Sequence, residues 1–337
     1  MLLRISCGLL AALAAIAAVP AAAQDKARVA TVTVHSAAIE GNLEGNSAER
    51  TVYVVTPPGY DEHPGKHYPV VYFLHGYYVE PKAYADLFDL QDALSGAAAA
   101  GNEVIFVMPD GYSKHRGSFY SNSPTTGNYE DFVAEDLVAY IDSHYRTIAK
   151  REGRGLAGHS MGGYGALRVG MNHSEVFSSL YVMSAGGGSV RPITREAAES
   201  VIADQGTVDL AAPIGGVQGE LARLAAWSPD PTKAPNYVDP GLRADGTIDP
   251  DIQARIAANS ITGMLPGHVR DLKRYEAIAL DVGDKDGLMA DSKKFSGEMD
   301  RFGIAHRLEI YDGGHGDKVK ERLRSKVLPF FAAHLDK

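Results

Sequence analysis

Residues 155–170 read GLAGHSMGGYGALRVG and place the pattern Gly-x-Ser-x-Gly on Gly158, Ser160 and Gly162. A short apolar run, typical of a buried strand, precedes the serine, and a helical pattern begins at once with Met161. A serine at such a junction lies in a sharp turn, and the glycines two positions either side let the backbones approach closely. The turn presents the hydroxyl at the carboxyl end of a sheet, so the stretch predicts that Ser160 is a nucleophile.

The remaining chain alternates short apolar runs with helical patterns. Apolar runs that we expect to be strands lie at 29–34, 51–55, 70–74, 104–108, 155–157, 180–183, 277–282 and 307–311. Helical patterns lie at about 81–99, 130–145, 162–172, 292–302 and 318–335. The first two strands alternate in polarity and predict an antiparallel start. Short buried strands between helices predict an α/β fold with a mainly parallel central sheet and helices on both faces.

A serine hydroxyl needs a base that takes its proton, and a histidine on another loop is the usual choice. His315 lies in the sequence GGHG at 313–316, between a predicted strand and the last helical pattern. This position predicts that His315 is the base. Two other histidines fit less well, because His159 flanks the nucleophile and His334 lies in the terminal helix.

The third member of a triad is an acid that holds the imidazole tautomer. The strand before His315 is itself preceded by a strand that leads into GDKDG at 283–287. Both Asp284 and Asp286 are candidates. We favour Asp286, since the acid in this kind of loop usually follows the glycine by three residues, and Asp284 then caps the loop. The order serine, acid, histidine is that of α/β hydrolases.

Two backbone N–H groups are needed to stabilise the oxyanion of a tetrahedral intermediate. We expect one from Met161, which follows the nucleophile directly. The other is expected from Tyr77, in the loop HGYY at 75–78 that follows a predicted strand. Aromatic side chains on the predicted carboxyl-end loops suit a phenolic acyl group or a sugar face, and equally suit loops that pack together. They are Tyr77, Tyr78, Tyr112, Phe119, Tyr120, Tyr129, Tyr164 and Trp227.

Five motifs together resemble a known family. They are TPPGY at 56–60, LHG at 74–76, MPDG at 108–111, GHSMGGYGA at 158–166 and GGH at 313–315. The set is similar to the putative-esterase family of α/β hydrolases, which includes esterase D (S-formylglutathione hydrolase), feruloyl and acetylxylan esterases, and the antigen 85 mycolyltransferases. The resemblance runs over about 45–335 and is interrupted by 186–274.

The resemblance implies an α/β-hydrolase fold and an ester or thioester hydrolase that needs no cofactor. Carried over by position, Ser160 is the nucleophile, Asp286 the acid and His315 the base, with Met161 and Tyr77 as oxyanion donors. The expected reaction is hydrolysis through an acyl-enzyme, on feruloyl- or acetyl-type esters of carbohydrates. Three alternatives stay open, which are an acyltransferase of the mycolyltransferase type, a peptidase, and a catalytically inactive, hydrolase-like binding protein.

The first 23 residues differ in character from the rest. Arg4 precedes an apolar run at 9–19, and Pro20 and three alanines follow. This pattern predicts a signal peptide cleaved near Ala23 and an exported protein, periplasmic or secreted, without a stable membrane anchor. The only cysteine, Cys7, lies inside this segment. Residues 24–337 are then expected to form one α/β-hydrolase domain, with 186–274 as a cap-like insertion before the strand that bears the acid.

The composition and net charge indicate a globular protein and argue against some kinds of partner. Of the 337 residues, 45% are hydrophobic and 22% charged, which is enough apolar material for a large core. The formal net charge of −9 argues against a nucleic-acid partner. His63 and His67 are spaced like zinc ligands on a helix, but Pro64 and Gly65 prevent that helix. The expected partner is a small-molecule or carbohydrate-linked ester, and the sequence leaves the oligomeric state open.

Overall fold

The computed structural model describes residues 26–187, 191–204, 206 and 216–337. The predicted signal peptide and its cleavage site lie outside the described residues. In the part of the chain that is described, no helix is both long and apolar enough to cross a bilayer.

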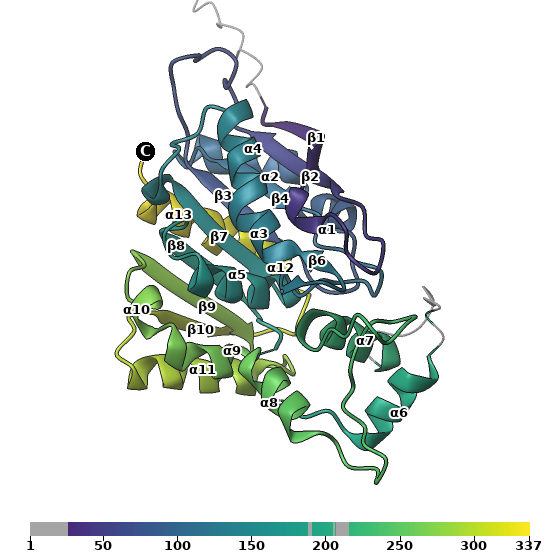
Figure 1. Ribbon diagram of the computed structural model, residues 1–337. Helices are drawn as coiled ribbons and strands as arrows, with labels where there is room; N and C mark the ends of the chain where they lie inside the picture. Colours follow the sequence, from purple (N-terminus) through teal and green to yellow (C-terminus); the bar gives the residue numbers. More distant parts are fainter. Residues whose placement is uncertain (1–25, 188–190, 205, 207–215) are drawn as a thin grey trace, which may run out of the picture.

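An eight-stranded sheet forms the centre of the molecule, in the order β1-β2-β4-β3-β7-β8-β9-β10 (Figure 1). Its strands are β1 (Arg28–His35), β2 (Glu49–Thr56), β3 (Val70–Leu74), β4 (Ile105–Pro109), β7 (Arg154–His159), β8 (Ser179–Met183), β9 (Ala277–Gly283) and β10 (Arg307–Tyr311). β2 pairs antiparallel with both β1 and β4, and all later pairs are parallel. The predicted mainly parallel sheet with an antiparallel start is therefore confirmed.

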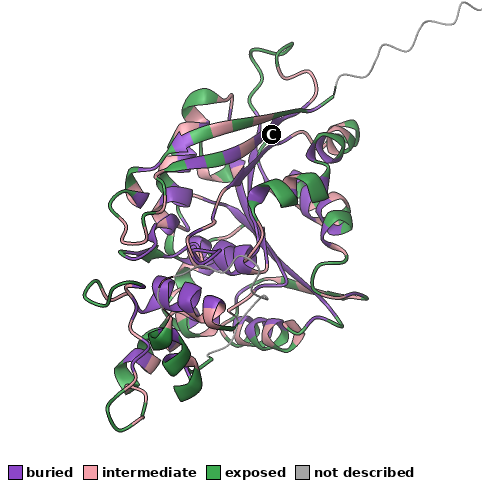
Figure 2. Ribbon diagram, turned by 90° about the vertical axis from the view of Figure 1, so that its right-hand side faces the viewer, coloured by how far each residue is buried: buried purple, intermediate pink, exposed green. Residues whose placement is uncertain are grey.

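Helices cover both faces of this sheet (Figure 1). One face carries α3 (Tyr129–Asp131), α4 (Leu137–His144), α5 (Met161–Asn172) and α11 (Met289–Arg301). The other carries α1 (Pro81–Phe88), α2 (Leu90–Ala99), α12 (Val319–Arg322) and α13 (Leu328–His334). The strand β3 shows why two layers form. Val70, Tyr72 and Leu74 enter one apolar core and Val71 and Phe73 the other, because successive strand residues point to opposite faces. Figure 2 shows the buried residues along the strands and the helix faces that meet them.

Three predicted helices differ in detail from the structure. The pattern at 81–99 is two helices, because Asp89 adopts a left-handed backbone with φ 49°, a conformation that aspartate tolerates better than most residues. A π-helical turn, Phe132–Asp136, precedes α4, and a second one, Leu323–Val327, joins α12 to α13. A short hairpin of β5 (Asn122–Ser123) and β6 (Gly127–Asn128) was not expected from the sequence.

The segment 186–274 forms helices, of which the first three lie beyond one end of the sheet and the last two contact α5 (Figure 1). They are α6 (Arg195–Ala203), α7 (Gly216–Trp227), α8 (Pro250–Ala258), α9 (Ile261–Met264) and α10 (Val269–Leu272). Their buried side chains, such as Leu221, Trp227 and Ile256, belong to the same apolar core as β3 and α5. The segment therefore packs on the sheet domain through a shared core.

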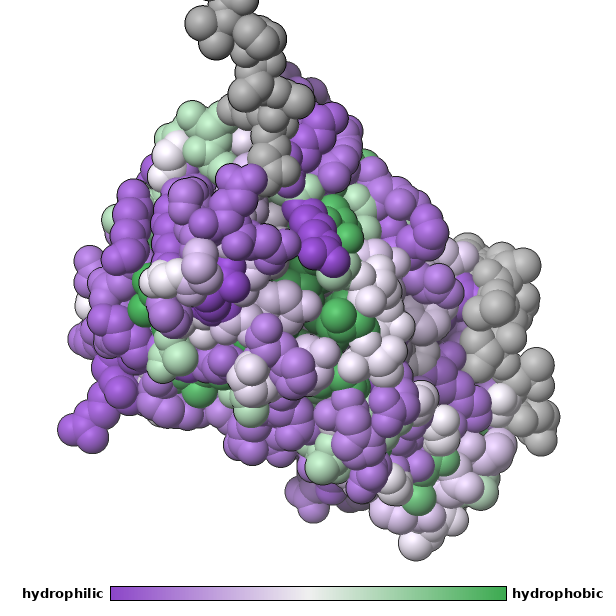
Figure 3. All heavy atoms as spheres, turned by 90° about the horizontal axis from the view of Figure 1, so that it is seen from above, coloured by the Kyte–Doolittle hydropathy of each residue, from purple (hydrophilic) through white to green (hydrophobic). Residues whose placement is uncertain are grey.

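The outer surface is largely hydrophilic, as the face in Figure 3 shows. Among the described residues, the large hydrophobic side chains that are exposed lie on four separate elements and form no patch. They are Val29, Leu87, Ile202 and Ile310.

Candidate active site

Ser160 lies between the end of β7 and the start of α5 and adopts a left-handed backbone, with φ 60° and ψ −116°. A serine holds such a conformation only where its surroundings fix it. Here the Ser160 N–H donates to the carbonyl of Met183 (2.9 Å), and the Ser160 carbonyl accepts the N–H of Gly186 (2.8 Å). The end of β8 and the loop after it thus bind both backbone polar groups of Ser160 and hold the turn in place.

The glycines of the Gly-x-Ser-x-Gly pattern are required by close backbone contacts. A Cβ atom on Gly158 would lie 2.1 Å from the carbonyl oxygen of Gly162. A Cβ atom on Gly162 would lie 1.9 Å from the carbonyl oxygen of Leu74, at the end of β3. Both distances are far below van der Waals contact, so any larger residue would move the turn and the hydroxyl that it presents.

The structure brings the three predicted triad residues together. The Nε2 atom of His315 lies 2.9 Å from the hydroxyl of Ser160, and its Nδ1 atom lies 2.9 Å from Oδ2 of Asp286. Because the carboxylate can only accept, Nδ1 carries the proton and Nε2 is left as the acceptor for the serine hydroxyl. This is the tautomer that a general base at Ser160 needs.

Asp286 stays ionised in this arrangement. Burial disfavours its charged form, but hydrogen bonds from the N–H of Leu288 (2.8 Å) and from His315 outweigh burial and lower the pKa of the carboxyl. Asp284, the other candidate acid, points elsewhere, since its Oδ1 atom accepts the N–H of Gly313 (3.0 Å). Asp284 therefore caps the loop that bears His315, and Asp286 contacts the imidazole.

The two predicted oxyanion residues lie beside the serine. Met161 is the first residue of α5, where the N–H groups of the first turn have no acceptor within the helix. Tyr77 follows Gly76, and a Cβ atom on Gly76 would lie 3.4 Å from Cβ of Ser160. Tyr77, Ser160 and Met161 all line one cavity.

Two buried histidines that the sequence left unassigned hold the loops of the site. Nε2 of His75 accepts the N–H of Gly111 (2.8 Å), which fastens the HG loop to the DG turn after β4. His159 lies 2.7 Å from the hydroxyl of Tyr84 through Nδ1 and 2.8 Å from the carbonyl oxygen of His315 through Nε2. Burial lowers the pKa of His159 to about 4, so this ring is neutral at neutral pH. His159 therefore donates to the His315 carbonyl and accepts from Tyr84.

The cavity beside Ser160 has a volume of about 260 Å³. Its lining residues come from the sheet loops and from the segment 186–274, and they are Tyr77, Phe119, Ser160, Met161, Gly186, Gly187, Arg191, Gly219, Arg223, Trp227, Ile256, Ser260 and Leu288. The rings of Phe119 and Trp227 are 5.1 Å apart, and Tyr77 stacks on Phe119 at 6.3 Å. The other five predicted aromatic residues do not line this cavity, and three of them are fully buried: Tyr120, Tyr129 and Tyr164.

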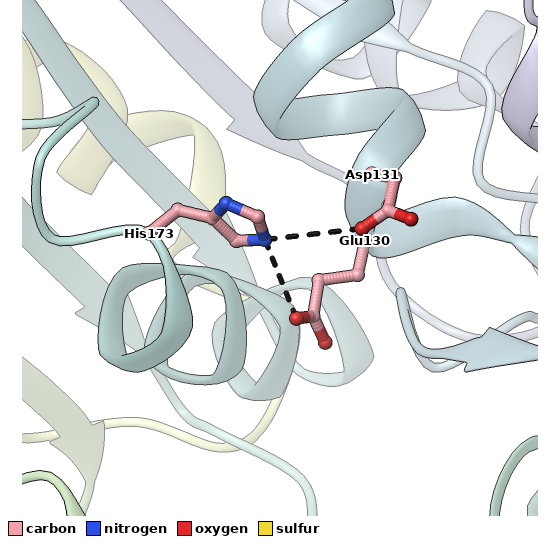
Figure 4. A group of neighbouring side chains, drawn as sticks. All are labelled: Glu130, Asp131 and His173. Carbon is pink, nitrogen blue, oxygen red and sulfur yellow. Dashed lines mark ion pairs between the residues drawn. The ribbon is translucent and has the colours of Figure 1, made fainter.

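One group among the described residues has the spacing of metal ligands, namely Glu130, Asp131 and His173 (Figure 4). The Glu130 carboxylate already binds two donors, Nε of Arg168 (2.6 Å) and the side-chain amide of Asn172 (2.8 Å). The hydrogen bond to Glu130 also raises the pKa of His173. The guanidinium of Arg168 already binds the Glu130 carboxylate. The group is therefore an ion-pair network between α3 and the end of α5.

A buried acid, Glu44, lies beside a buried histidine, His115, in the loop that also bears Phe119. Oε1 of Glu44 lies 3.6 Å from Nε2 of His115, and both side chains are almost fully buried. Burial raises the pKa of Glu44 to about 7 and lowers the pKa of His115 to about 4. Both groups are therefore neutral in slightly acidic solution.

Glu44→Gln is expected to stabilise the protein at alkaline pH. The pKa of Glu44 is higher in the folded state than in the unfolded state, so its contribution to stability is complete below the unfolded pKa near 4.5 and is lost as pH rises through 7. Glutamine does not titrate. The variant's advantage in the free energy of unfolding should grow by roughly 2–3 kcal/mol between pH 5 and 8. Urea unfolding of wild type, Glu44→Gln and the exposed control Glu62→Gln measures it, and an advantage that does not change with pH would contradict the assignment.

Two curated proteins are similar in sequence to part of this chain. Esterase MT1326 of Mycobacterium tuberculosis (strain CDC 1551 / Oshkosh) is 36% identical over 120 residues, which are 34% of this chain and 25% of the relative. An acetyl esterase of Caldicellulosiruptor saccharolyticus is 30% identical over 121 residues, 34% of this chain and 40% of that protein. The alignments thus span a quarter and two fifths of these relatives' lengths.

Solved structures resemble the chain over nearly its whole length. A ferulic acid esterase has a TM-score of 0.66 at 24% identity, covering 92% of this chain and 100% of that chain. An S-formylglutathione hydrolase from Staphylococcus aureus has a TM-score of 0.61 at 15% identity, covering 92% and 99%. At these identities the likeness shows a shared α/β-hydrolase fold.

The sequence family described as Putative esterase matches residues 45–262. The match includes Tyr77, Ser160 and Met161, runs through most of the segment 186–274, and ends before Asp286 and His315. It covers more than half of the chain, in agreement with the resemblance carried by the motifs. The chain therefore has an α/β-hydrolase fold and belongs to the Putative esterase family.

Proposed function

We propose that this protein is a serine carboxylic-ester hydrolase that works through an acyl-enzyme. The observation that carries the proposal is the hydrogen-bonded chain from the Ser160 hydroxyl through His315 to Asp286. In this geometry the imidazole accepts the serine proton while the carboxylate stabilises the imidazolium that forms. The family of the chain and the named activities of its relatives support the same class of reaction.

The proposed reaction has two halves. Oγ of Ser160 attacks the ester carbonyl carbon, its proton moves to Nε2 of His315, and the proton then passes to the departing alcohol oxygen as the ester bond breaks. Water attacks the acyl-enzyme, gives a proton to Nε2, and the proton returns to Oγ as the acid leaves. The N–H groups of Met161 and Tyr77 stabilise the oxyanion in both halves.

We propose feruloyl- or acetyl-type esters of carbohydrates as the substrate class. The aromatic walls of the cavity, Phe119 and Trp227, offer a face for a phenolic ring. The relatives include an acetyl esterase and the structural neighbours a ferulic acid esterase. We further propose, from the pattern of the first 23 residues, that the protein is exported after cleavage near Ala23.

Stopped-flow hydrolysis of p-nitrophenyl acetate tests the function. The proposal predicts turnover with an initial burst of one p-nitrophenol per active site wherever deacylation is the slower step. Adding an acceptor alcohol distinguishes a hydrolase from an acyltransferase, since a transferase would convert the ester mainly to a new ester instead of acetate. Folded protein that turns over no ester at all would contradict the proposal and favour a binding protein.

His159 is expected to act as a positioning residue for His315. His159→Phe removes the donor to the His315 carbonyl, so we expect kcat to fall by about 10-fold while KM changes little. Glutamine can donate to the same carbonyl, so His159→Gln should retain more of kcat than the phenylalanine variant. Steady-state kinetics on p-nitrophenyl acetate measure the effect. Tyr84→Phe is the control variant, because it leaves the His159–His315 contact in place. An unchanged kcat in His159→Phe would show that the contact is not needed.

A further inference from the structure

Two arginines are the only charged residues among the described residues that line the cavity beside Ser160. They are Arg191, which follows the loop after β8, and Arg223, on α7. The other lining residues are apolar, aromatic or small, apart from the hydroxyl groups of Tyr77, Ser160 and Ser260. An apolar cavity with a few convergent polar groups is the usual form of a ligand site, and the polar groups fix the ligand's orientation.

Arg223 is held in one orientation. Its Nε and Nη2 atoms donate to Oε2 of Glu220 at 3.0 and 2.6 Å, and its Nη1 atom donates to the carbonyl oxygen of Arg191 at 2.7 Å. The Arg223 side chain is only 10% exposed. This set of contacts fixes the guanidinium against α7 and anchors the backbone of Arg191 at the cavity.

Arg191 is the more open of the two. Its side chain is 67% exposed, and its ion pair with Asp291 is a single contact of 3.5 Å through Nη2. Neither Asp291 nor Glu220 lines the cavity. The cavity lining therefore holds two guanidinium groups, each paired with a carboxylate that lies outside the lining, and that of Arg191 is the more weakly paired and the more exposed.

The cavity is placed to hold the acyl side of an ester. It is lined by Ser160 and by both oxyanion residues, Tyr77 and Met161, which must contact the carbonyl group that is attacked. His315, which gives its proton to the departing alcohol, does not line the cavity. An acyl chain bound here would extend from Ser160 past the rings of Phe119 and Trp227, with the alcohol on the side of His315.

We propose that this protein prefers esters whose acyl group has an apolar body and ends in a carboxylate, that is, half-esters of dicarboxylic acids. The inference rests on the proposed esterase function and changes the acyl class for the same site, from a neutral feruloyl or acetyl group to a group that carries a carboxylate at its far end. The planar guanidinium of Arg191 can bind a carboxylate with two parallel hydrogen bonds. Charge-assisted bonds of this kind are about twice as strong as neutral ones. The volume of about 260 Å³ lies just below the usual range for ligand sites and suits one ring or a short chain.

A matched pair of esters tests the preference. The methyl esters of 4-carboxycinnamic acid and 4-isopropylcinnamic acid differ only in a carboxylate or an apolar group of similar shape. We expect kcat/KM of the wild type to be at least about 10-fold higher for the carboxylate ester, in line with a charge-assisted contact. Arg191→Gln should bring the ratio of the two esters close to one, because the substrate carboxylate then loses its charged partner in the cavity.

Arg195→Gln is the control for this test. Arg195 is also an exposed arginine in a single ion pair, with Glu199 on α6, and does not line the cavity. The ratio of the two esters should stay at the wild-type value in this variant. A ratio near one in the wild type, or a ratio that Arg191→Gln does not change, would overturn the inference while leaving the esterase function in place. Failure of the wild type to hydrolyse either ester and p-nitrophenyl acetate would overturn both.

Discussion

Ser160→Ala is expected to lower kcat for p-nitrophenyl acetate by roughly 10⁴-fold or more, because the variant has no oxygen to form the acyl-enzyme. The turn itself should remain, since its backbone bonds to Met183 and Gly186 do not involve the hydroxyl. The residual rate would come from the oxyanion donors and from binding alone. Steady-state hydrolysis, corrected for the spontaneous reaction, measures the loss.

Two controls show that the loss comes from the missing hydroxyl of Ser160 and not from unfolding. Thermal unfolding of Ser160→Ala should match the wild type closely, and Ser325→Ala, on the helical C-terminal segment, should hydrolyse the ester at the wild-type rate. A Ser160→Ala variant that retains more than about a tenth of kcat would place the nucleophile elsewhere.

Asp286→Asn is expected to lower kcat by roughly 10³–10⁴-fold, the second largest effect. An amide that offers its N–H to Nδ1 of His315 would force the proton to Nε2, where it blocks acceptance of the serine proton. The matched variant Asp284→Asn should lose less than about 10-fold, because the Asp284 side chain binds the backbone N–H of Gly313 and not the imidazole of His315.

The pair of variants decides between the two aspartates that the sequence left open. Both changes replace a carboxylate by an amide of the same shape within one loop, so a general weakening of the loop would affect them alike. Equal losses in the two variants, or a larger loss in Asp284→Asn, would contradict the assignment of Asp286.

The sheet could be predicted almost completely from the sequence, for a physical reason. Buried parallel strands are short apolar runs bounded by polar turns, and each of the eight predicted runs coincides with a strand of the sheet. The helix patterns were located correctly but their interruptions were not. A left-handed residue at Asp89 and the π turn at Phe132–Asp136 change local backbone hydrogen bonds, which the pattern of apolar residues does not report.

The site was predictable to the extent that its chemistry lies in short motifs. The elbow at Ser160 and the GGH loop at His315 are local patterns, and the structure brings their side chains within hydrogen-bonding distance. The contact of Tyr84 with His159 joins residues 75 positions apart and leaves no pattern in either segment. Arg223 lines the cavity because of the place where α7 packs on the rest of the molecule, and the amino-acid composition does not reveal that place.

Fluorophosphonate labelling followed by peptide mapping tests the central claim most directly. The probe reacts with a serine whose hydroxyl is activated by a base and whose adduct is stabilised by an oxyanion site. The account predicts one adduct per chain, on the peptide that contains Ser160, and none in Ser160→Ala. Folded wild-type protein that takes up no probe, or that carries the adduct on a different serine, would contradict it.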